Sequence, residues 1–242
     1  MIVLAQQLAP SVPTFDPVYL IITGGAMLVS WLVGAMLQRR FREYSQMPVR
    51  MTGAQVAQKM LHDSGIHDVR IISTPGQLTD HYNPLDKTVN LSEPVYHANS
   101  VAAAAVAAHE CGHAIQHARA YAPLKMRSAL VPVVSFTSHW VQYVLIFGLI
   151  LASSGTGNVT VLFIGVALFA MTTLFSVITL PVEFDASNRA LAWLDSSRTL
   201  ANVEHEKAKN ALFWAAMTYT VAAIASIGQL LYYVFRLMEA RR

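Results

Sequence analysis

The chain has 242 residues, of which 54% are hydrophobic and only 13% are charged, a composition too apolar for an ordinary soluble domain. Its net charge of +3 does not indicate a nucleic-acid partner, because the basic residues flank apolar segments and form no stripe with interleaved aromatic residues. The single cysteine, Cys111, excludes an internal disulfide. The composition therefore favours a membrane protein, whose partner is a lipid bilayer and not a nucleic acid.

Four apolar segments are long enough to cross a bilayer, which takes about 20 residues. They follow an N-terminal segment (1–17) that lacks the basic start and the cleavage site of a signal peptide. The polar stretch SSGTGN divides one long uncharged run into two segments. We predict transmembrane helices at 18–38, 130–152, 159–181 and 211–235.

The distribution of Lys and Arg predicts the orientation of these spans. Fourteen of the 17 basic residues lie in 39–129 and 182–210, which four spans place on the same side of the bilayer. Because cytoplasmic loops carry an excess of Lys and Arg, both segments should be cytoplasmic. The three arginines of the C-terminal tail would then lie outside. If the segment 211–235 re-entered the membrane, the tail would return to the cytoplasm, and the sequence leaves both possibilities open.

The segment between the first two spans can form a small α+β domain. Thr52 and Gln55 have the spacing of a capping box and predict a short helix that stops near Gly65. A strand is predicted at 69–73, and two extended runs within 78–92 predict a hairpin. This domain would carry the chemistry, since it is the longest part of the chain outside the apolar segments.

An HExxH motif lies in an alanine-rich helix that Asn99 or Ser100 can cap. His109 and His113 are one turn apart on one face of that helix, so their imidazoles can share one metal ion. Glu110 borders the same cleft, where it can accept a proton from a water that the metal activates. The motif predicts a zinc site with Glu110 as general base.

A catalytic zinc needs a third protein ligand. His117 is near in sequence, but three histidines on successive turns are too far apart for one ion. Glu183 and Asp185 are the first carboxylates after the long uncharged run, at the end of the predicted third span. We predict Glu183 as the ligand, with Asp185 supporting a ligand or pairing with Arg189 one turn later.

Four motifs of the chain together resemble a known family. HECGHAIQ, preceded by LTDHYNP and NLSEPVY and followed by LPVEFDASNRA, is similar to the YugP-like neutral zinc metallopeptidases of bacterial membranes. The resemblance runs from about Arg42 to Tyr233. It implies one Zn²⁺ per chain on His109, His113 and Glu183, and a multi-pass protein of the bacterial cytoplasmic (inner) membrane.

The resemblance also implies a likeness to gluzincins such as the HtpX and CAAX-prenyl endopeptidases. The implied fold is mainly α, with about four transmembrane helices and a small α+β, zincin-like cytoplasmic metallopeptidase domain that carries the HExxH helix. Those relatives usually have Asp four residues after the ligand Glu, where it orients a metal histidine. Here that position is Ser187, and the nearby acid is Asp185, so the sequence does not settle which residue orients the ring.

A peptidase also needs a donor for the developing oxyanion and an edge strand that holds an extended substrate. The hairpin at 78–92 could offer the edge. His81 and Tyr82 on this hairpin, and Arg189 and His205 in the segment 182–210, are the candidate donors.

The sequence thus predicts a membrane-integrated zinc endopeptidase that cuts membrane-associated proteins or peptides at the cytoplasmic surface. The alternative is a non-catalytic membrane scaffold with a structural metal site. Glu110 favours the enzyme, because a structural site has no use for a base beside an open coordination position. The oligomeric state is not indicated.

Overall fold

The computed structural model describes residues 16–153 and 159–241, so most of the predicted segment 1–17 and of the stretch SSGTGN falls outside the described residues. Among the described residues the elements are, in order, α1 (Pro17–Ser45), α2 (Gly53–Asp63), β1 (Arg70–Thr74), β2 (His81–Asn83), β3 (Thr88–Ser92), α3 (Glu93–His97), α4 (Val101–Ala118), α5 (Ala122–Ser138), α6 (Val141–Ser153), α7 (Thr160–Ser196) and α8 (Asn202–Ala240).

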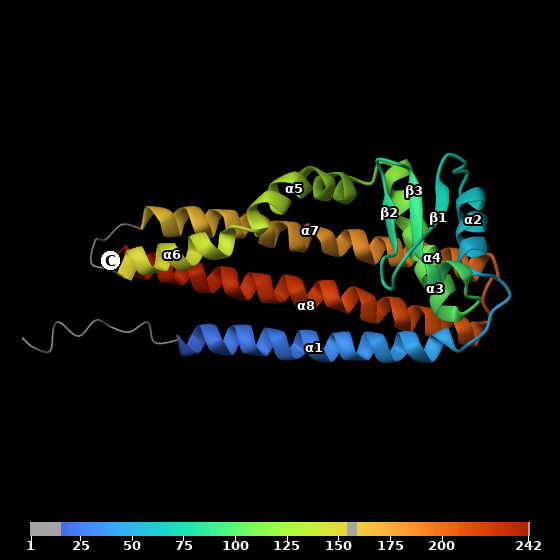
Figure 1. Cartoon of the computed structure of the whole chain (residues 1–242), viewed down its shortest axis with the longest axis horizontal. Coiled ribbons are helices and arrows are strands. Elements are labelled where there is room, and N and C mark those ends of the chain that lie inside the picture. The colour runs from blue at the N-terminus through green and yellow to red at the C-terminus, as the bar shows by residue number, and fades with distance from the viewer. Residues whose placement is uncertain (1–15, 154–158, 242) are drawn as a thin grey trace, which may run out of the picture.

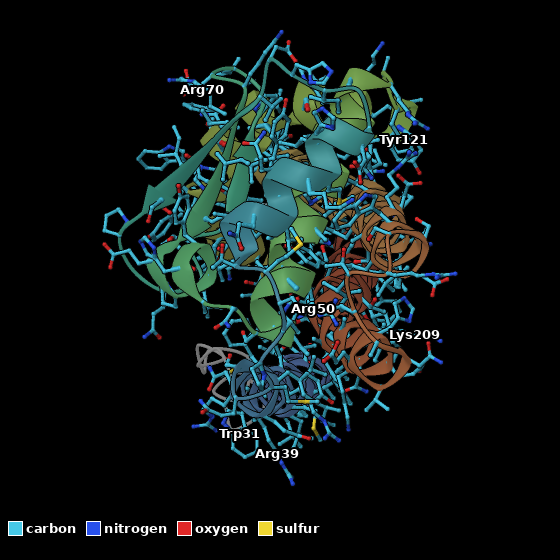
Figure 2. All side chains as sticks on the ribbon, turned by 90° about the vertical axis from the view of Figure 1, so that its right-hand side faces the viewer. Trp31, Arg39, Arg50, Arg70, Tyr121 and Lys209 are labelled. Atoms are coloured by element: carbon cyan, nitrogen blue, oxygen red, sulfur yellow. The ribbon has the colours of Figure 1, made fainter. Side chains whose placement is uncertain are left out.

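Long helices run side by side along the molecule, and the small sheet lies at one end of them with α2, α3 and α4 (Figure 1). Within the described part of the chain, three single helices are long and apolar enough to cross a membrane: α1, α7 and α8. Large apolar side chains on α1 face outward, with Ile21 74% and Trp31 67% exposed. Figure 2 shows Trp31 and Arg39 directed away from the other helices. Such a surface suits contact with lipid.

The predicted second span, 130–152, differs from the structure. It is split between α5 and α6, whose axes are bent by 54°. Next to the break, the Thr137 and Ser138 hydroxyls and His139 Nδ1 all bond to carbonyls of their own helix, which competes with backbone hydrogen bonding. α6 alone is about 20 Å long, short of the roughly 30 Å of a hydrocarbon core. A fourth crossing therefore requires the bent pair as one broken span.

The third and fourth predicted spans are parts of longer helices. α7 continues through Pro181 to Ser196 and α8 begins at Asn202, so most of the predicted segment 182–210 is a helical extension of the two spans. Glu183 therefore lies on the same rigid helix as the third apolar segment. α8 is unbroken to Ala240, so it has no turn of the kind that a re-entrant segment needs, and its C-terminal end lies away from the sheet (Figure 1).

The small sheet has the order β1-β3-β2, with β1 parallel and β2 antiparallel to the central strand β3. The predicted hairpin is the β2–β3 pair, and the predicted capping box of Thr52 and Gln55 opens α2. Every residue of β3 is buried. Because β3 is the central strand, β2 is an edge strand of the sheet, and it lies next to α4.

α4 is the centre of the main hydrophobic core, packed by α2, α7, α8 and the sheet. Ser100 caps it by accepting a hydrogen bond from the Ala103 amide. Six of the seven residues from Ala102 to Ala108 are buried, because short alanine side chains let neighbouring elements approach closely. The alanine-rich run thus places the HExxH motif inside the protein, among several packed elements.

Candidate metal centre

The metal centre depends on a close contact between α4 and α7. At Gly112, between the two histidines of the HExxH motif, an added Cβ would lie 2.6 Å from the Ala186 carbonyl oxygen. Real Cβ atoms do not approach a backbone oxygen so closely. Glycine at this position therefore lets α7 lie directly against α4, which brings Glu183 to His109 and His113.

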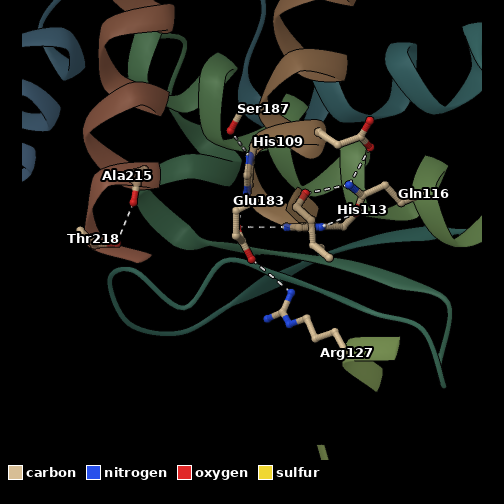
Figure 3. Close-up of polar contacts among 10 residues, drawn as sticks. His109, His113, Gln116, Arg127, Glu183, Ser187, Ala215 and Thr218 are labelled. Carbon is tan, nitrogen blue, oxygen red and sulfur yellow. Dashed lines mark hydrogen bonds and ion pairs between the residues drawn. The ribbon is translucent and has the colours of Figure 1, made fainter. Parts of the chain in front are cut away.

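The three predicted ligands come together on the facing sides of these helices (Figure 3). Their ligand atoms all lie within 4.8 Å of one another. Glu183 Oε2 is 3.3 Å from His109 Nε2 and 3.6 Å from His113 Nε2. The Glu183 side chain is 3% exposed and the two imidazoles 14% and 12%. Two ring nitrogens and one carboxylate oxygen thus converge on one partly enclosed point.

Gln116 holds the ring of His113. Its amide nitrogen donates to the Val182 carbonyl at 2.7 Å and to Asp185 Oδ2 at 2.8 Å, so its oxygen is the atom that faces His113 Nδ1 at 3.0 Å. In the neutral ring Nδ1 then carries the proton, which leaves the lone pair of Nε2 for a metal ion. Arg189 completes the network by binding Asp185 at 2.6 Å.

Ser187 holds the ring of His109. Its hydroxyl lies 3.2 Å from His109 Nδ1, and the position is four residues after Glu183, where the resemblance predicted an Asp. A hydroxyl can accept the Nδ1 proton as a carboxylate does. Both histidine rings are thus held through Nδ1, while Nε2 of each ring faces Glu183.

Arg127 binds the oxygen of Glu183 that faces away from the histidines. Its Nη1 is 3.1 Å from Oε1, whereas Oε2 is the oxygen that faces the two rings. Arg127 comes from α5, so this ion pair links the bent helix pair to the metal centre. A guanidinium in this place also offsets the negative charge of a nearly buried carboxylate.

The electrostatics of the site centre on His113. Burial alone would lower its pKa, but the hydrogen bond to Glu183 and the negative charge of Glu110 outweigh burial and raise the pKa.

Glu110 is 8% exposed, and within residues 16–153 and 159–241 no hydrogen bond or ion pair reaches its carboxylate. The donor set fits Zn²⁺, which binds imidazole nitrogen and carboxylate oxygen.

The other predicted site residues have different partners. Of the candidate oxyanion donors, His81 bonds to the Thr79 carbonyl, Tyr82 donates to or accepts from His117 Nδ1 at 2.9 Å, and His205 bonds to the Leu191 carbonyl. Arg189 is paired with Asp185. Tyr82 on β2 therefore contacts α4 at His117, one turn beyond His113, whereas His205 contacts the later part of α7.

Sequence reasoning missed three residues of the site: Gln116, Arg127 and Ser187. A signal existed for Ser187, because it occupies the position at which a histidine-orienting residue was expected. Gln116 lies three residues after His113, on the same side of the helix, and its role could have been suspected. Nothing in the sequence ties Arg127 to Glu183, since that contact depends on where α5 lies.

Comparison with known proteins identifies the family of the chain. The family described as "Putative neutral zinc metallopeptidase" matches residues 19–238. The chain belongs to this family. The chain is 36% identical to the "Putative membrane protease YugP" of Bacillus subtilis (strain 168) over 225 residues. The aligned region covers 92% of this chain and 98% of that protein. No solved structure matches the chain.

Proposed function

We propose that the chain is a membrane-integrated zinc endopeptidase that hydrolyses peptide bonds of membrane-associated proteins or peptides. The observation that carries this proposal is the convergence of His109, His113 and Glu183, whose ligand atoms lie within 4.8 Å of one another. The family and the similarity to a membrane protease support it. The small α+β unit around α4 would then be a zincin-like domain, with the ligand set of a gluzincin.

One Zn²⁺ per chain would be held by His109, His113 and Glu183. Zinc supplies Lewis-acid chemistry, which polarises a peptide carbonyl and makes water more acidic. Glu110 takes the proton of the attacking water and passes it to the leaving amine. Gln116 and Ser187 keep the ring nitrogens in the state that binds metal, so the geometry does not have to form during each turnover.

The site would lie at the cytoplasmic surface of a bacterial inner membrane. The sheet, α4, the end of α7 and the start of α8 lie together at one end of the molecule (Figure 1). The segments 39–129 and 182–210, which contribute these elements, hold 14 of the 17 basic residues. An excess of Lys and Arg favours the cytoplasmic side. Glu183 is a few residues beyond the apolar part of α7, so a substrate would be cut close to the bilayer.

The alternative function is a scaffold with a structural metal, and Glu110→Gln separates the two. The amide keeps the size of the side chain but cannot take a proton, so we expect zinc content to stay at that of the wild type and peptide cleavage to fall by at least about 10³-fold. The measurements are metal analysis of the detergent-purified protein and cleavage of a peptide library with and without a chelator.

The matched control is Glu206→Gln, an exposed glutamate near the start of α8, which should change neither quantity. Cleavage that survives in the Glu110 variant would refute the assigned base. A wild-type protein that holds zinc and cleaves nothing would favour the scaffold.

A further inference from the structure

A cavity of about 370 Å³ lies between the turn that follows β2, the end of α4 and the start of α5. This volume is within the range of small-ligand pockets. Figure 1 shows α5 beginning beside the sheet and running away from it toward α6. The cavity is lined by Pro84, Leu85, Gln116, His117, Ala120, Tyr121, Leu124, Lys125 and Ser128.

The cavity adjoins the metal centre through two elements. On α4 it shares Gln116, whose oxygen is 3.0 Å from His113 Nδ1. On α5 its lining residue Ser128 directly follows Arg127, whose Nη1 binds Glu183 at 3.1 Å. A group in the cavity would therefore contact Gln116, the side chain that holds the ring of His113.

The edge strand β2 leads into the same cavity. β2 ends at Asn83, and the next two residues line the cavity wall. Tyr82 on β2 contacts His117, which is another lining residue. An extended peptide that pairs with an edge strand presents alternate side chains to pockets beside that strand. The position of the cavity thus suits one side chain of such a peptide.

The polarity and charge of the lining residues determine which substrate side chains the cavity can accept. Most of it is apolar, including Leu124 and Leu85, the latter 92% exposed at the rim. Lys125 is the only Lys, Arg, Asp or Glu among the lining residues. Beyond the cavity, α5 continues with exposed Val131 and Phe136, so apolar surface extends from the cavity toward α6. A peptide that leaves the bilayer along α5 would bring apolar side chains to the cavity.

We propose that this cavity is a specificity pocket, which takes a large apolar side chain beside the scissile bond and rejects Lys and Arg. The proposal rests on the peptidase function proposed above. The apolar lining favours Leu, Phe or Met by burial, and Lys125 repels a substrate cation at short range. The preferred substrate is thus a peptide with a large apolar residue at one position next to the cleaved bond.

The test profiles cleavage of a randomised peptide library by the zinc-loaded protein in detergent, with mass spectrometry of the products. For the wild type we expect a strong preference for Leu, Phe or Met at one position and exclusion of Lys and Arg there. Leu124→Trp fills the cavity and should lower kcat/KM for those peptides by at least about tenfold. Met126→Trp, on an exposed residue of the same helix outside the lining, should leave it unchanged.

A second variant covers the case in which Leu124→Trp fails to fold. Lys125→Glu reverses the charge at the cavity and should raise kcat/KM for peptides with Lys at that position by at least about tenfold, with zinc content unchanged. Wild-type cleavage with no preference at any position, or a preference that neither variant changes, would overturn the pocket while the peptidase stands. No cleavage of any peptide by the wild type would overturn both.

Discussion

Gln116 is the residue that joins α4, α7 and the metal centre through one side chain. It is fully buried, and its amide reaches His113, the Val182 carbonyl and Asp185. A buried amide with all of these partners in place adopts one orientation, because the reverse orientation would set oxygen against oxygen at two of them. The protein itself therefore sets the orientation of the His113 ring, with no metal ion needed to hold it.

Replacing Gln116 with Met tests this role, because Met has similar length but no amide. The ring of His113 would lose its fixed tautomer, and removing such a support typically weakens metal binding by about 10 to 100-fold. We expect a weaker zinc affinity of that size, measured by competition with a chelating dye. Gln58→Met on the exposed side of α2 is the control. Equal zinc affinity in both variants would contradict the role of Gln116.

The residue scale is also where the sequence was most informative. Spacing alone pairs His109 with His113, and the end of the uncharged run draws attention to Glu183. Spacing does not reveal Arg127 or the division of the work between Ser187 and Asp185. Ser187 reaches His109, while Asp185 acts on His113 through Gln116. These assignments depend on the rotation of α7 about its axis, which a helical pattern does not specify.

At the scale of elements, the contact between α4 and α7 determines whether the site exists. The contact places Glu183 against the HExxH face, and it depends on the absence of a side chain at Gly112. Buried backbone atoms on α7 cannot move aside as a flexible side chain could. A single methyl group at this position would therefore separate the helices.

Gly112→Ala should therefore reduce both zinc affinity and stability, even though alanine has a higher helix propensity than glycine. Overpacking of this kind costs about 1–3 kcal/mol or more, and a shift of α7 also removes Glu183 from the histidines. Thermal unfolding in detergent and zinc titration measure the two effects. The matched control is Gly228→Ala on α8, where the nearest atom to a new Cβ is a side-chain carbon at 3.6 Å. Equal behaviour of the two variants would contradict the close-packing argument.

The sequence predicted the starts of helices and the hairpin better than it predicted where long helices bend or end. Caps and turns are local signals, so the starts of α2 and α4 and the β2–β3 hairpin follow from short stretches. Hydropathy reports which residues avoid water but not where a helix bends. For that reason two features were not predicted: the break near His139, and the union of the third span and the residues after Pro181 in one helix.

At the scale of the whole molecule, the long helices set the distance between the two ends. α7 is about 55 Å long, well beyond a hydrocarbon core of roughly 30 Å. α8 runs back from the sheet to the opposite end, with Arg236 and Arg241 near its C-terminal end. If the sheet is cytoplasmic, these arginines lie on the outer side, where they oppose the charge bias of the rest of the chain.

Cys111 makes this orientation measurable. It is fully buried, with Sγ 3.6 Å from the Ala57 carbonyl, and burial raises the pKa of its thiol. The thiolate is the reactive form, so the native cysteine should not react with a thiol reagent in the folded protein. A cysteine introduced at either end would then report its own position without removal of Cys111.

We expect Arg241→Cys to react with a membrane-impermeant maleimide in intact bacterial cells, because this residue is exposed at the end of α8 far from the sheet. Glu206→Cys, exposed near the other end of the same helix, should react only after the cells are permeabilised. The wild type should stay unlabelled under both conditions, which serves as the control. The reverse pattern would place the metal centre outside the cell. Labelling of both variants in intact cells would exclude α8 as a membrane span, since its ends could then not be on opposite sides of the bilayer.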